Sequence, residues 1–390
     1  MASGGSGDGS GLERLLAGSV DALPAGRLAE QLEEGNELRV KFGMDPTSAD
    51  IHLGHCVVLQ KLRDFQDLGH VVVLIVGDYT SRVGDPSGRD EGRPVLTPEQ
   101  IAENAQTYQE QAFKVLDRER TEIRHNSEWL GMPSAELFDL IRRFTVARLL
   151  ERDDFQRRME RNQGISALEL LYPVLQGYDS VAVEADVELG GADQRFNLLF
   201  GRDVQESFGQ SPQSILTMPL LVGTDGVRKM SKTYDNYVGV TDEPEEMFGR
   251  LMSIPDELMA DYYLLLLGRE PDPSAHPNEA KRALGRELVA RFHGGDAAES
   301  AEARFDAIHK RGEVPADMPT VTLADGETVH LPALLASSFE ISSSEARRLL
   351  SQGGVRLDGH ALTADVLDVP ASELSGKVLQ LGKRRFVRVA

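Results

Sequence analysis

The stretch LRVKFGMDPTSADIHLGHCVVLQKLRDFQDLGHVVVLIVG, residues 38–77, decides the fold class of this chain. Residues 38–42 have the pattern of a short strand that runs into the turn 43–47, and apolar residues then recur at helical spacing until Gly69. Residues 70–77 are a continuous, largely β-branched apolar run, which is typical of a central parallel strand covered on both faces. Strand, helix and strand in this order predict a βαβ unit, and hence an α/β fold with parallel strands.

Outside this unit, the sequence predicts further α/β elements and then a helical domain. The α/β elements are a helix over 97–117, a mostly helical stretch over 127–162, a helix over 167–178 and a strand over 185–189. The later helices are predicted over 245–251, 256–267 and 277–293. Because strand signals become rare after residue 243, a second, helical domain is predicted to begin there. A compact αβ segment with short basic strands then closes the chain.

The composition limits the class of protein. Of the 390 residues, 41% are hydrophobic and 27% are charged, which is typical of a globular chain of two or three domains and excludes a disordered or fibrous protein. Cys56 is the single cysteine, so no intrachain disulfide or cysteine-rich zinc site can form, as expected in a reducing compartment. The small polar N-terminal tail and the lack of a long apolar run favour a cytoplasmic protein with no membrane association.

The charge is unevenly distributed along the chain. The formal net charge of −21 argues against broad, nonspecific coating of nucleic acid. Residues 345–390 nevertheless contain eight Lys or Arg against five Asp or Glu, which indicates a basic module on an acidic chain. From charge alone, a solvated surface explains this segment equally well.

Two short motifs carry candidate phosphate chemistry. HLGH, residues 52–55, lies where the first strand gives way to a helix, the place at which doubly wound folds bind phosphates. Alone, this histidine pair also fits a chance occurrence or a partial metal site. KMSKT, residues 229–233, follows the turn 223–226 and places two lysines three residues apart. Alone, it fits an ordinary solvated basic turn.

Together with their flanking sequence, these motifs resemble those of class I aminoacyl-tRNA synthetases, and more closely those of bacterial-type tyrosyl-tRNA synthetases. HLGH corresponds to the HIGH signature of the class, and KMSKT corresponds to KMSKS. The flanking motifs that carry the resemblance are GMDPT (43–47), GDPSG (84–88), YPVLQGYD (172–179) and GGADQ (190–194). The C-terminal stretches SEARRLL (344–350) and QGGVRL (352–357) resemble an S-four-type RNA-binding module. The resemblance covers nearly the whole chain after the tail.

The resemblance implies a domain organisation. It implies an α/β fold: a Rossmann-like catalytic domain with a doubly wound parallel sheet, an α-helical anticodon-binding domain and a small C-terminal α+β RNA-binding domain of the S-four type. The expected segments are a disordered tail (1–11), the catalytic domain (12–237), the anticodon-binding domain (238–311), a linker (312–327) and the RNA-binding domain (328–390). A helical insertion near 127–162 in the catalytic domain is the expected homodimer surface.

The resemblance also implies a reaction: L-tyrosine is activated with ATP, and the tyrosyl group is transferred to the 3′ end of tyrosine tRNA. The tyrosine carboxylate is already ionised at neutral pH, so its attack on the α-phosphate needs no general base, and catalysis depends on positioning and on cations. The residues implied to act on the phosphates, together with Mg²⁺, are Thr47, His52, His55, Arg89, Arg93, Lys229 and Lys232. Further ATP contacts are implied for Gly43, Asp45, Gly54, Gly191, Asp193, Met230 and Ser231. No structural metal is expected.

Contacts to tyrosine and to RNA are implied in the same way. Asp85, Tyr172 and Gln176 are assigned to the α-ammonium group of tyrosine. Asp179 is assigned to the phenol hydroxyl, and Gln194 to the α-phosphate or the substrate carboxylate. Without the other motifs, Tyr172 and Gln176 fit one face of a buried helix. The implied RNA contacts are Arg347, Arg348, Arg356, Lys383, Arg384 and Arg385.

Several positions depart from the family pattern. Lys41, which is included among the tyrosine contacts, stands where many members have a tyrosine, although a bacterial subgroup also has lysine. Ala192 replaces a hydroxyl residue, Thr233 replaces the last serine of KMSKS, and the pair 234–235 replaces Leu-Gly. These changes leave open a divergent, inhibitor-tolerant paralogue. A noncatalytic RNA-binding relative with the same fold is a further alternative.

Overall fold

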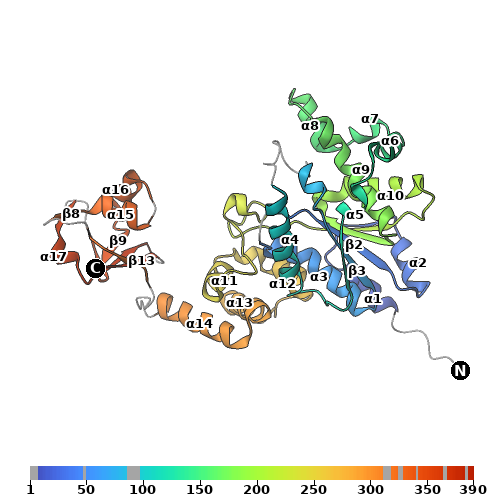
Figure 1. Cartoon of the computed structure of the whole chain (residues 1–390). Coiled ribbons are helices and arrows are strands. Elements are labelled where there is room, and N and C mark those ends of the chain that lie inside the picture. The colour runs from blue at the N-terminus through green and yellow to red at the C-terminus, as the bar shows by residue number, and fades with distance from the viewer. Residues whose placement is uncertain are drawn as a thin grey trace. The chain divides into compact units, whose positions relative to one another are not determined.

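The computed structural model describes residues 8–46, 50–85, 97–310, 318–323, 328–339, 341–362, 367–382 and 385–390. The chain divides into two compact units, Met1–Ala298 and Glu299–Ala390 (Figure 1). Among the described residues, no helix is both long and apolar enough to cross a membrane.

A six-stranded sheet organises the first unit, in the order β1-β6-β5-β2-β3-β4. Its strands are β1 (Asp21–Leu23), β2 (Arg39–Met44), β3 (Val71–Val76), β4 (Thr121–His125), β5 (Val187–Gly191) and β6 (Ser214–Met218). Strands β2 to β6 run parallel, whereas the edge strand β1 pairs antiparallel with β6. The prediction of an entirely parallel sheet is therefore wrong at this edge, because a three-residue strand is too short to show a periodic pattern.

The direction in which the parallel strands are added reverses between β2 and β5. From β2 the chain passes through α3 (Leu53–Asp67) to β3 on one side, and from β5 it passes through α10 (Arg195–Ser207) to β6 on the other side. Right-handed crossovers in opposite directions place α3 and α10 on opposite faces of the sheet. The carboxyl ends of β2 and β5 therefore flank a crevice of the kind at which doubly wound folds bind ligands.

The remaining helices agree with the predicted helical regions, except at the N-terminus. In the first unit they are α1 (Asp8–Leu16), α2 (Arg27–Glu33), α4 (Pro98–Ala112), α5 (Ser127–Leu130), α6 (Ser134–Ile141), α7 (Val146–Leu149), α8 (Asp153–Glu160), α9 (Ala167–Ala182), α11 (Pro244–Met252), α12 (Met259–Leu267) and α13 (Pro277–His293). Helix α14 (Gly295–Lys310) follows. The predicted tail over 1–11 is wrong from Asp8 onward. Arg14 of α1 binds Asp64 at 2.8 Å and Asp67 at 2.6 Å on α3, a tertiary contact that tail composition does not reveal.

Hydrogen bonds at the ends of helices α4 and α9 set the boundaries of α4 and of strand β5. Helix α4 begins where the Thr97 hydroxyl accepts from the Gln100 N–H at 3.3 Å and the Gln100 side chain accepts from the Thr97 N–H at 3.0 Å, a capping box. It ends at Ala112 rather than at residue 117, because the N–H groups of Lys114 and Val115 bond to carbonyl groups three residues back. Strand β5 begins at Val187 rather than at residue 185, because the Ala185 N–H closes the end of α9.

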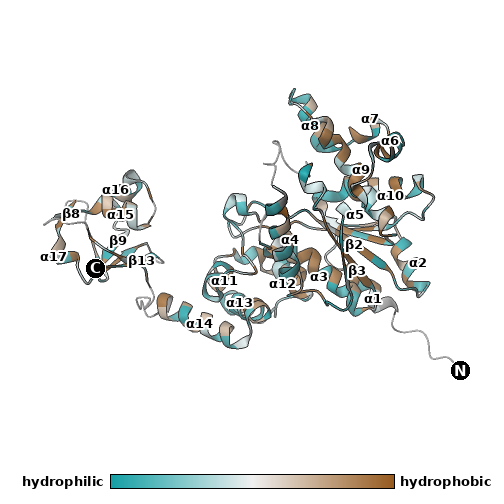
Figure 2. Cartoon of the chain, viewed as in Figure 1, coloured by the Kyte–Doolittle hydropathy of each residue, from teal (hydrophilic) through white to brown (hydrophobic). Residues whose placement is uncertain are grey.

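The apolar side chains of the central strands form the core of the first unit. Val72, Val73 and Leu74 of β3 and Val187 of β5 are completely buried. Figure 2 shows the hydrophobic colouring concentrated on the central strands, while the outer helices carry both colours. The predicted fully buried strand over 70–77 is confirmed as β3.

Helices α9 and α10 approach closely through glycines. A Cβ atom added at Gly177 would lie 2.5 Å from Cγ2 of Val204 and 3.2 Å from the Cα of Gly201. Because a real Cβ cannot come so close, the two backbones keep this distance only when residue 177 has no side chain.

Gly177→Ala is expected to lower the free energy of unfolding by roughly 1–3 kcal/mol, because the methyl group has to displace Val204 or separate the helices. Gly249→Ala on α11 is the matched control, since nothing lies within 4 Å of its added Cβ. We expect the control to be neutral or stabilising by up to about 1 kcal/mol. Chemical unfolding measures both, and equal destabilisation would contradict the close packing.

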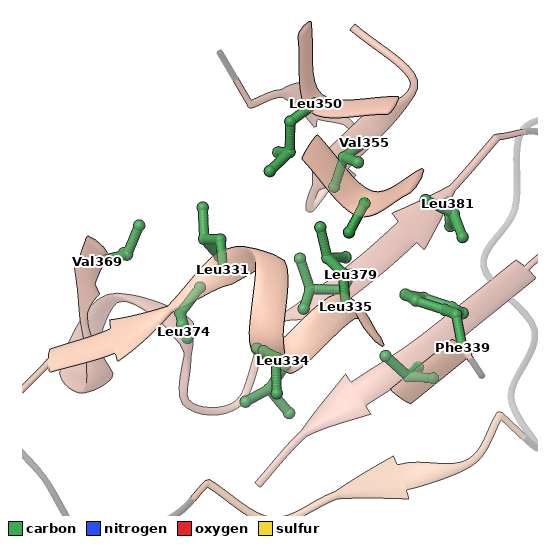
Figure 3. Close-up of a cluster of buried hydrophobic side chains, with 13 residues drawn as sticks. Leu331, Leu334, Leu335, Phe339, Leu350, Val355, Val369, Leu374, Leu379 and Leu381 are labelled. Atoms are coloured by element: carbon green, nitrogen blue, oxygen red, sulfur yellow. The ribbon is translucent and has the colours of Figure 1, made fainter. Parts of the chain in front are cut away.

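The second unit has its own core. Its strands are β7 (Thr320–Val321), β8 (Thr328–His330), β9 (Val355–Leu357), β10 (His360–Ala361), β11 (Asp368–Pro370), β12 (Val378–Leu381) and β13 (Arg385–Val389), and its further helices are α15 (Leu331–Phe339), α16 (Ser343–Ser351) and α17 (Ala371–Leu374). They form a five-stranded sheet, β10-β9-β12-β13-β7, and a two-stranded one, β11-β8. Figure 3 shows the buried cluster, in which Leu331, Leu335 and Leu379 are completely covered. This content agrees with the predicted compact αβ segment.

Candidate active site

A cavity of about 900 Å³ opens at the carboxyl ends of β2 and β5, where the strand order reverses. Its lining includes most residues that the sequence assigned to ATP and tyrosine: Gly43, Asp45, His52, Gly54, His55, Asp85, Tyr172, Gln176, Asp179, Gly191, Asp193, Gln194, Lys229, Met230, Ser231 and Lys232. Thr47, Arg89 and Arg93 lie outside the described residues. The fold thus gathers, in one cavity, motifs that are far apart in the sequence.

The HLGH turn begins α3 and fixes both imidazole rings. Nδ1 of His52 accepts from the Gly54 N–H at 3.2 Å, and Nδ1 of His55 accepts from the His52 N–H at 3.2 Å. The neutral rings therefore carry their protons on Nε2. Burial, and then the neighbouring His55, lowers the pKa of His52 to about 2, while burial and then Lys232 lower the pKa of His55 to about 4. At neutral pH both histidines are uncharged hydrogen-bond donors.

The KMSKT segment is held in place by Asn236, a buried residue that sequence analysis did not single out. The Ser231 N–H donates to Oδ1 of Asn236 at 2.8 Å, and the Asn236 amide donates to the carbonyl oxygen of Lys229 at 3.1 Å. The segment is also bonded to the chain that precedes it, because the Met230 N–H donates to the carbonyl of Leu221 at 2.7 Å. No sequence motif marks Asn236, because its role depends on how the loop folds back.

The chain that follows KMSKT pairs with the HLGH turn. The Leu53 N–H donates to the Val238 carbonyl at 2.9 Å, and the Val240 N–H donates to the Ile51 carbonyl at 3.0 Å. An antiparallel bridge between His52 and Gly239 lies between these two bonds. The two signature motifs are therefore joined by backbone hydrogen bonds.

Both lysines of KMSKT contact carboxylates at the cavity. Nζ of Lys229 lies 3.2 Å from Oδ2 of Asp193, and Nζ of Lys232 lies 2.7 Å from Oδ2 of Asp50. These pairs are partly exposed, so each is worth at most about 1 kcal/mol. Each lysine can therefore leave its carboxylate for a ligand that carries more negative charge.

The departure at residue 235 preserves the backbone of the loop. Asp235 has a φ of 51°, in the left-handed region that favours glycine and tolerates aspartate. The family glycine at this place is thus replaced by a residue that can adopt the same conformation. Thr233 donates its backbone N–H to the Ser231 hydroxyl at 3.2 Å.

Asp179 on α9 is buried and held by two donors from the region after β4. Nε1 of Trp129 donates to Oδ1 at 2.8 Å, and Nδ2 of Asn126 lies 3.4 Å from Oδ2. Burial raises the pKa of Asp179 to about 7, against the opposing effects of Lys41 and of these donors. A hydroxyl donor placed here would favour the ionised form. Asn126 and Trp129 belong to no predicted motif. The signal that could have found them is their position just after β4, because ligands bind at the carboxyl ends of the strands in such folds.

The other residues assigned to tyrosine are held by contacts within the protein. The Tyr172 hydroxyl donates to Oδ2 of Asp45 at 2.8 Å, so these residues, assigned to different substrates, are neighbours. Nε2 of Gln194 donates to Oδ2 of Asp85 at 2.7 Å. The cavity thus presents side chains whose orientations are already fixed.

Lys41 does not line the cavity. Sequence analysis places it among the tyrosine contacts, whereas in the structure its ammonium is completely buried and lies 2.8 Å from Oε1 of Glu188. It also donates to the Gln176 carbonyl and to the Ser180 hydroxyl of α9, at 2.8 and 2.7 Å. The physical reason is the buried carboxylate of Glu188, a partner that motif comparison did not supply.

The residues assigned to RNA lie in the second unit. Arg347 and Arg356 are exposed on α16 and β9. Arg348 pairs with Glu345 at 3.0 Å, and the Arg385 guanidinium binds the Phe339 carbonyl. Lys383 and Arg384 lie outside the described residues.

Metal ligands are sparse in the part of the chain that the structure describes. It contains no group of three or more His, Cys, Asp or Glu side chains that could hold a metal ion. The interpretation of HLGH as part of a metal site therefore finds no third ligand among these residues.

Comparison with known proteins agrees with the resemblance of the motifs. Residues 33–310 match the family model of tRNA synthetases class I (W and Y). The chain is 49% identical to the tyrosine–tRNA ligase of Oleidesulfovibrio alaskensis over 97% of this chain and 98% of that protein. It is 51% identical to the tyrosine–tRNA ligase of Bordetella avium over 97% and 94%.

Solved structures of more distant sequence have a similar fold. A C-terminally truncated mitochondrial tyrosyl-tRNA synthetase from Aspergillus nidulans matches with a TM-score of 0.64 and 22% identity, over 77% of this chain and 94% of that chain. The tyrosyl-tRNA synthetase of Archaeoglobus fulgidus complexed with L-tyrosine matches with a TM-score of 0.62 and 23% identity, over 76% and 99%.

Proposed function

We propose that this chain, which belongs to the class I tRNA synthetases and within them to the tyrosine–tRNA ligases, activates L-tyrosine and attaches it to tyrosine tRNA. In the first step, a tyrosine carboxylate oxygen forms a bond to the α-phosphorus of ATP while the bond to the bridging β-phosphate oxygen breaks. Pyrophosphate leaves, and tyrosyl adenylate remains. In the second step, a hydroxyl of the terminal ribose of tRNA attacks the tyrosyl carbonyl carbon, and AMP leaves.

One observation carries this proposal: a single cavity joins the two phosphate-binding motifs to a buried acceptor for a phenol. His52, His55, Lys229 and Lys232 line it together with Asp179. The neutral histidines can donate to phosphate oxygens, and the lysines can neutralise the charge of the leaving pyrophosphate. Asp179 can accept from the phenol hydroxyl, which phenylalanine lacks. A protein that only binds RNA has no use for this combination.

The test is tyrosine-dependent exchange of labelled pyrophosphate into ATP, which requires reversible adenylate formation. We expect exchange with L-tyrosine in the presence of Mg²⁺, and far slower exchange with phenylalanine. No exchange with tyrosine, in a preparation that binds both substrates, would overturn the activation step. Exchange that persists with an inhibitor of related enzymes would favour a tolerant paralogue.

The proposal extends to partners and assembly. ATP enters as its Mg²⁺ complex, in which the ion is part of the substrate. Helices α6 to α9 expose a set of large apolar side chains, namely Phe138, Val146, Met159 and Leu168. Such exposure supports a homodimer formed through the insertion at 127–162. We also assign recognition of the anticodon to the helical segment 238–311. The single cysteine is buried, which suits a cytoplasmic enzyme.

Removing residues 311–390 is expected to leave adenylate formation nearly unchanged and to depress tRNA charging, because the cavity belongs to the first unit. A full-length variant with Arg347→Glu and Arg356→Glu is expected to lower kcat/KM for tRNA roughly tenfold, with a smaller effect at high salt. Arg118→Glu combined with Arg120→Glu, at two exposed arginines of the first unit, makes the same change in net charge and is the control. Unchanged charging by the double variant at moderate salt would remove the RNA role of this surface.

A further inference from the structure

Beneath the cavity lies a buried ion pair on neighbouring strands. Lys41 of β2 and Glu188 of β5 are register partners in the sheet, and their side chains are 0% and 1% exposed. Nζ of Lys41 lies 2.8 Å from Oε1 of Glu188. Replacing a buried ion pair by apolar residues is often neutral or stabilising, because desolvation of two charges is costly. Stability alone therefore does not account for this pair.

The Lys41 ammonium ties one turn of α9 to the sheet. Its three N–H donors have three acceptors: Glu188, the Gln176 carbonyl at 2.8 Å and the Ser180 hydroxyl at 2.7 Å. Two of these acceptors belong to the turn 176–180, which also carries Asp179. The position of this turn relative to the sheet is thus set by Lys41.

Glu188 determines how the Gln176 amide is turned. An ionised carboxylate only accepts hydrogen bonds, and Oε1 of Glu188 accepts from Nε2 of Gln176 at 3.2 Å. The amide therefore directs its NH₂ group to Glu188 and its carbonyl oxygen elsewhere. Among the described residues, Oε1 of Gln176 has no hydrogen-bond partner, although it is buried, and Gln176 lines the cavity. A buried carbonyl oxygen without a partner is a suitable acceptor for an ammonium group.

Helix α10 leaves room for the Glu188 carboxylate and its donors, because residue 201 has no side chain. The second carboxylate oxygen of Glu188 accepts from the Ser180 hydroxyl at 3.2 Å and from the Gln213 amide. A Cβ added at Gly201 of α10 would lie 2.8 Å from Nε2 of Gln213 and 3.2 Å from Oε2 of Glu188. All the acceptor capacity that faces α9 and α10 is therefore occupied by donors, which keeps Glu188 in one orientation.

We propose that Lys41 and Glu188 form a positioning pair that holds Gln176 with its carbonyl oxygen ready to accept from the α-ammonium group of the amino acid. This inference rests on the proposed function. Neither residue touches the substrate; both act through Gln176. The pair thereby contributes to the preference for an α-amino acid over a compound of the same shape without the amino group.

The test compares two ligands in a variant with no unpaired charge, Lys41→Met combined with Glu188→Gln. The glutamine at 188 can donate as well as accept, so the Gln176 amide is no longer held in one orientation. We expect the dissociation constant of L-tyrosine to rise roughly tenfold or more, the scale of a hydrogen bond to a charged group. Binding of 3-(4-hydroxyphenyl)propionate, which lacks the α-ammonium group, is expected to stay within about twofold.

A matched control and a second variant keep the result interpretable. Arg39→Met with Glu122→Gln removes a partly exposed ion pair that also starts from β2, at 2.8 Å, and is expected to affect neither ligand selectively. In a Gln176→Leu background, the Lys41 and Glu188 substitutions are expected to cause no further loss of selectivity, because the group that they position is absent.

The contrary outcomes are distinct. Equal weakening of both ligands, or unchanged tyrosine binding in the double variant, would show that the pair is only structural. If the double variant fails to fold, Lys41→Gln combined with Glu188→Gln, which also leaves no unpaired charge and keeps polar groups at both positions, gives the same comparison of the two ligands. If the parent enzyme itself shows no tyrosine-dependent pyrophosphate exchange, the proposed function fails instead, whatever the variants do.

Discussion

Lys232→Ala is expected to slow formation of tyrosyl adenylate roughly 10²–10³-fold while the affinity for ATP changes little. In the structure, the ammonium of Lys232 lies 2.7 Å from Asp50, so it has to leave this carboxylate before it can contact ATP. Negative charge builds up on pyrophosphate as its bond to the α-phosphorus breaks. A lysine that leaves a carboxylate for this charge binds the transition state more strongly than the ground state. Single-turnover kinetics at varied ATP separates the rate constant from the dissociation constant.

Two variants control this experiment. Lys232→Arg keeps the charge and is expected to lose less activity than Lys232→Ala. Asp50→Asn removes the carboxylate that contacts Lys232 and is expected to keep or increase the rate. An increase in the ATP dissociation constant that accounts for the whole effect of Lys232→Ala would show instead that the lysine binds ATP in the ground state.

Asp179→Asn is expected to reduce the preference for tyrosine over phenylalanine by roughly 1–3 kcal/mol, which corresponds to about 5- to 150-fold. With phenylalanine bound, the buried carboxylate keeps its contacts to Trp129 and Asn126 but lacks a hydroxyl partner. An amide at this position is uncharged, so leaving it without that partner costs less. Pyrophosphate exchange with each amino acid measures the ratio of kcat/KM values, and an unchanged ratio would show that another residue rejects phenylalanine.

The same substitution is expected to stabilise the fold at alkaline pH. Burial raises the pKa of Asp179 from the ordinary value of an aspartate to about 7 in the folded chain, so between these two values the folded chain keeps a proton that the unfolded chain has lost. The contribution of this carboxyl to stability therefore falls as pH rises through this window. Asparagine does not titrate, so its advantage in the free energy of unfolding grows with pH across this window, by a few kcal/mol in all. Urea unfolding at pH 5 and pH 8 measures it; an equal advantage at both would contradict the raised pKa.

The sequence was sufficient where a local pattern and the tertiary environment require the same structure. The apolar run that became β3 is buried on both faces, and α4 starts at the predicted place, where Thr97 and Gln100 cap it. It was insufficient for β1 and α1. A three-residue strand has no period, and α1 is placed by the contact of Arg14 with Asp64, which lies far along the chain.

In the candidate site too, local motifs predicted some residues, whereas others are recognised only from tertiary contacts. The motifs predicted which residues line the cavity, because their spacing identifies a family whose fold brings them together. They did not reveal Trp129 and Glu188, which act through contacts between distant segments, or Asn236, whose contacts depend on how its own loop folds back. Glu188 appears in the sequence as one polar residue in a short strand. Only the pairing of β2 with β5 shows that it faces Lys41.

The hydrogen bonds between the HLGH turn and residues 238–240 limit how the lysines can move. Because the lysine segment is fixed by Leu221 before it and by Leu53 after it, its ends stay in place when the side chains turn toward ATP. A free arm would lose loop-closure entropy in every catalytic cycle, whereas this segment loses it once, when the chain folds. The activation entropy of adenylate formation therefore contains little from the ordering of this loop, and the temperature dependence of the rate mainly reflects the breaking of contacts such as Lys232 with Asp50.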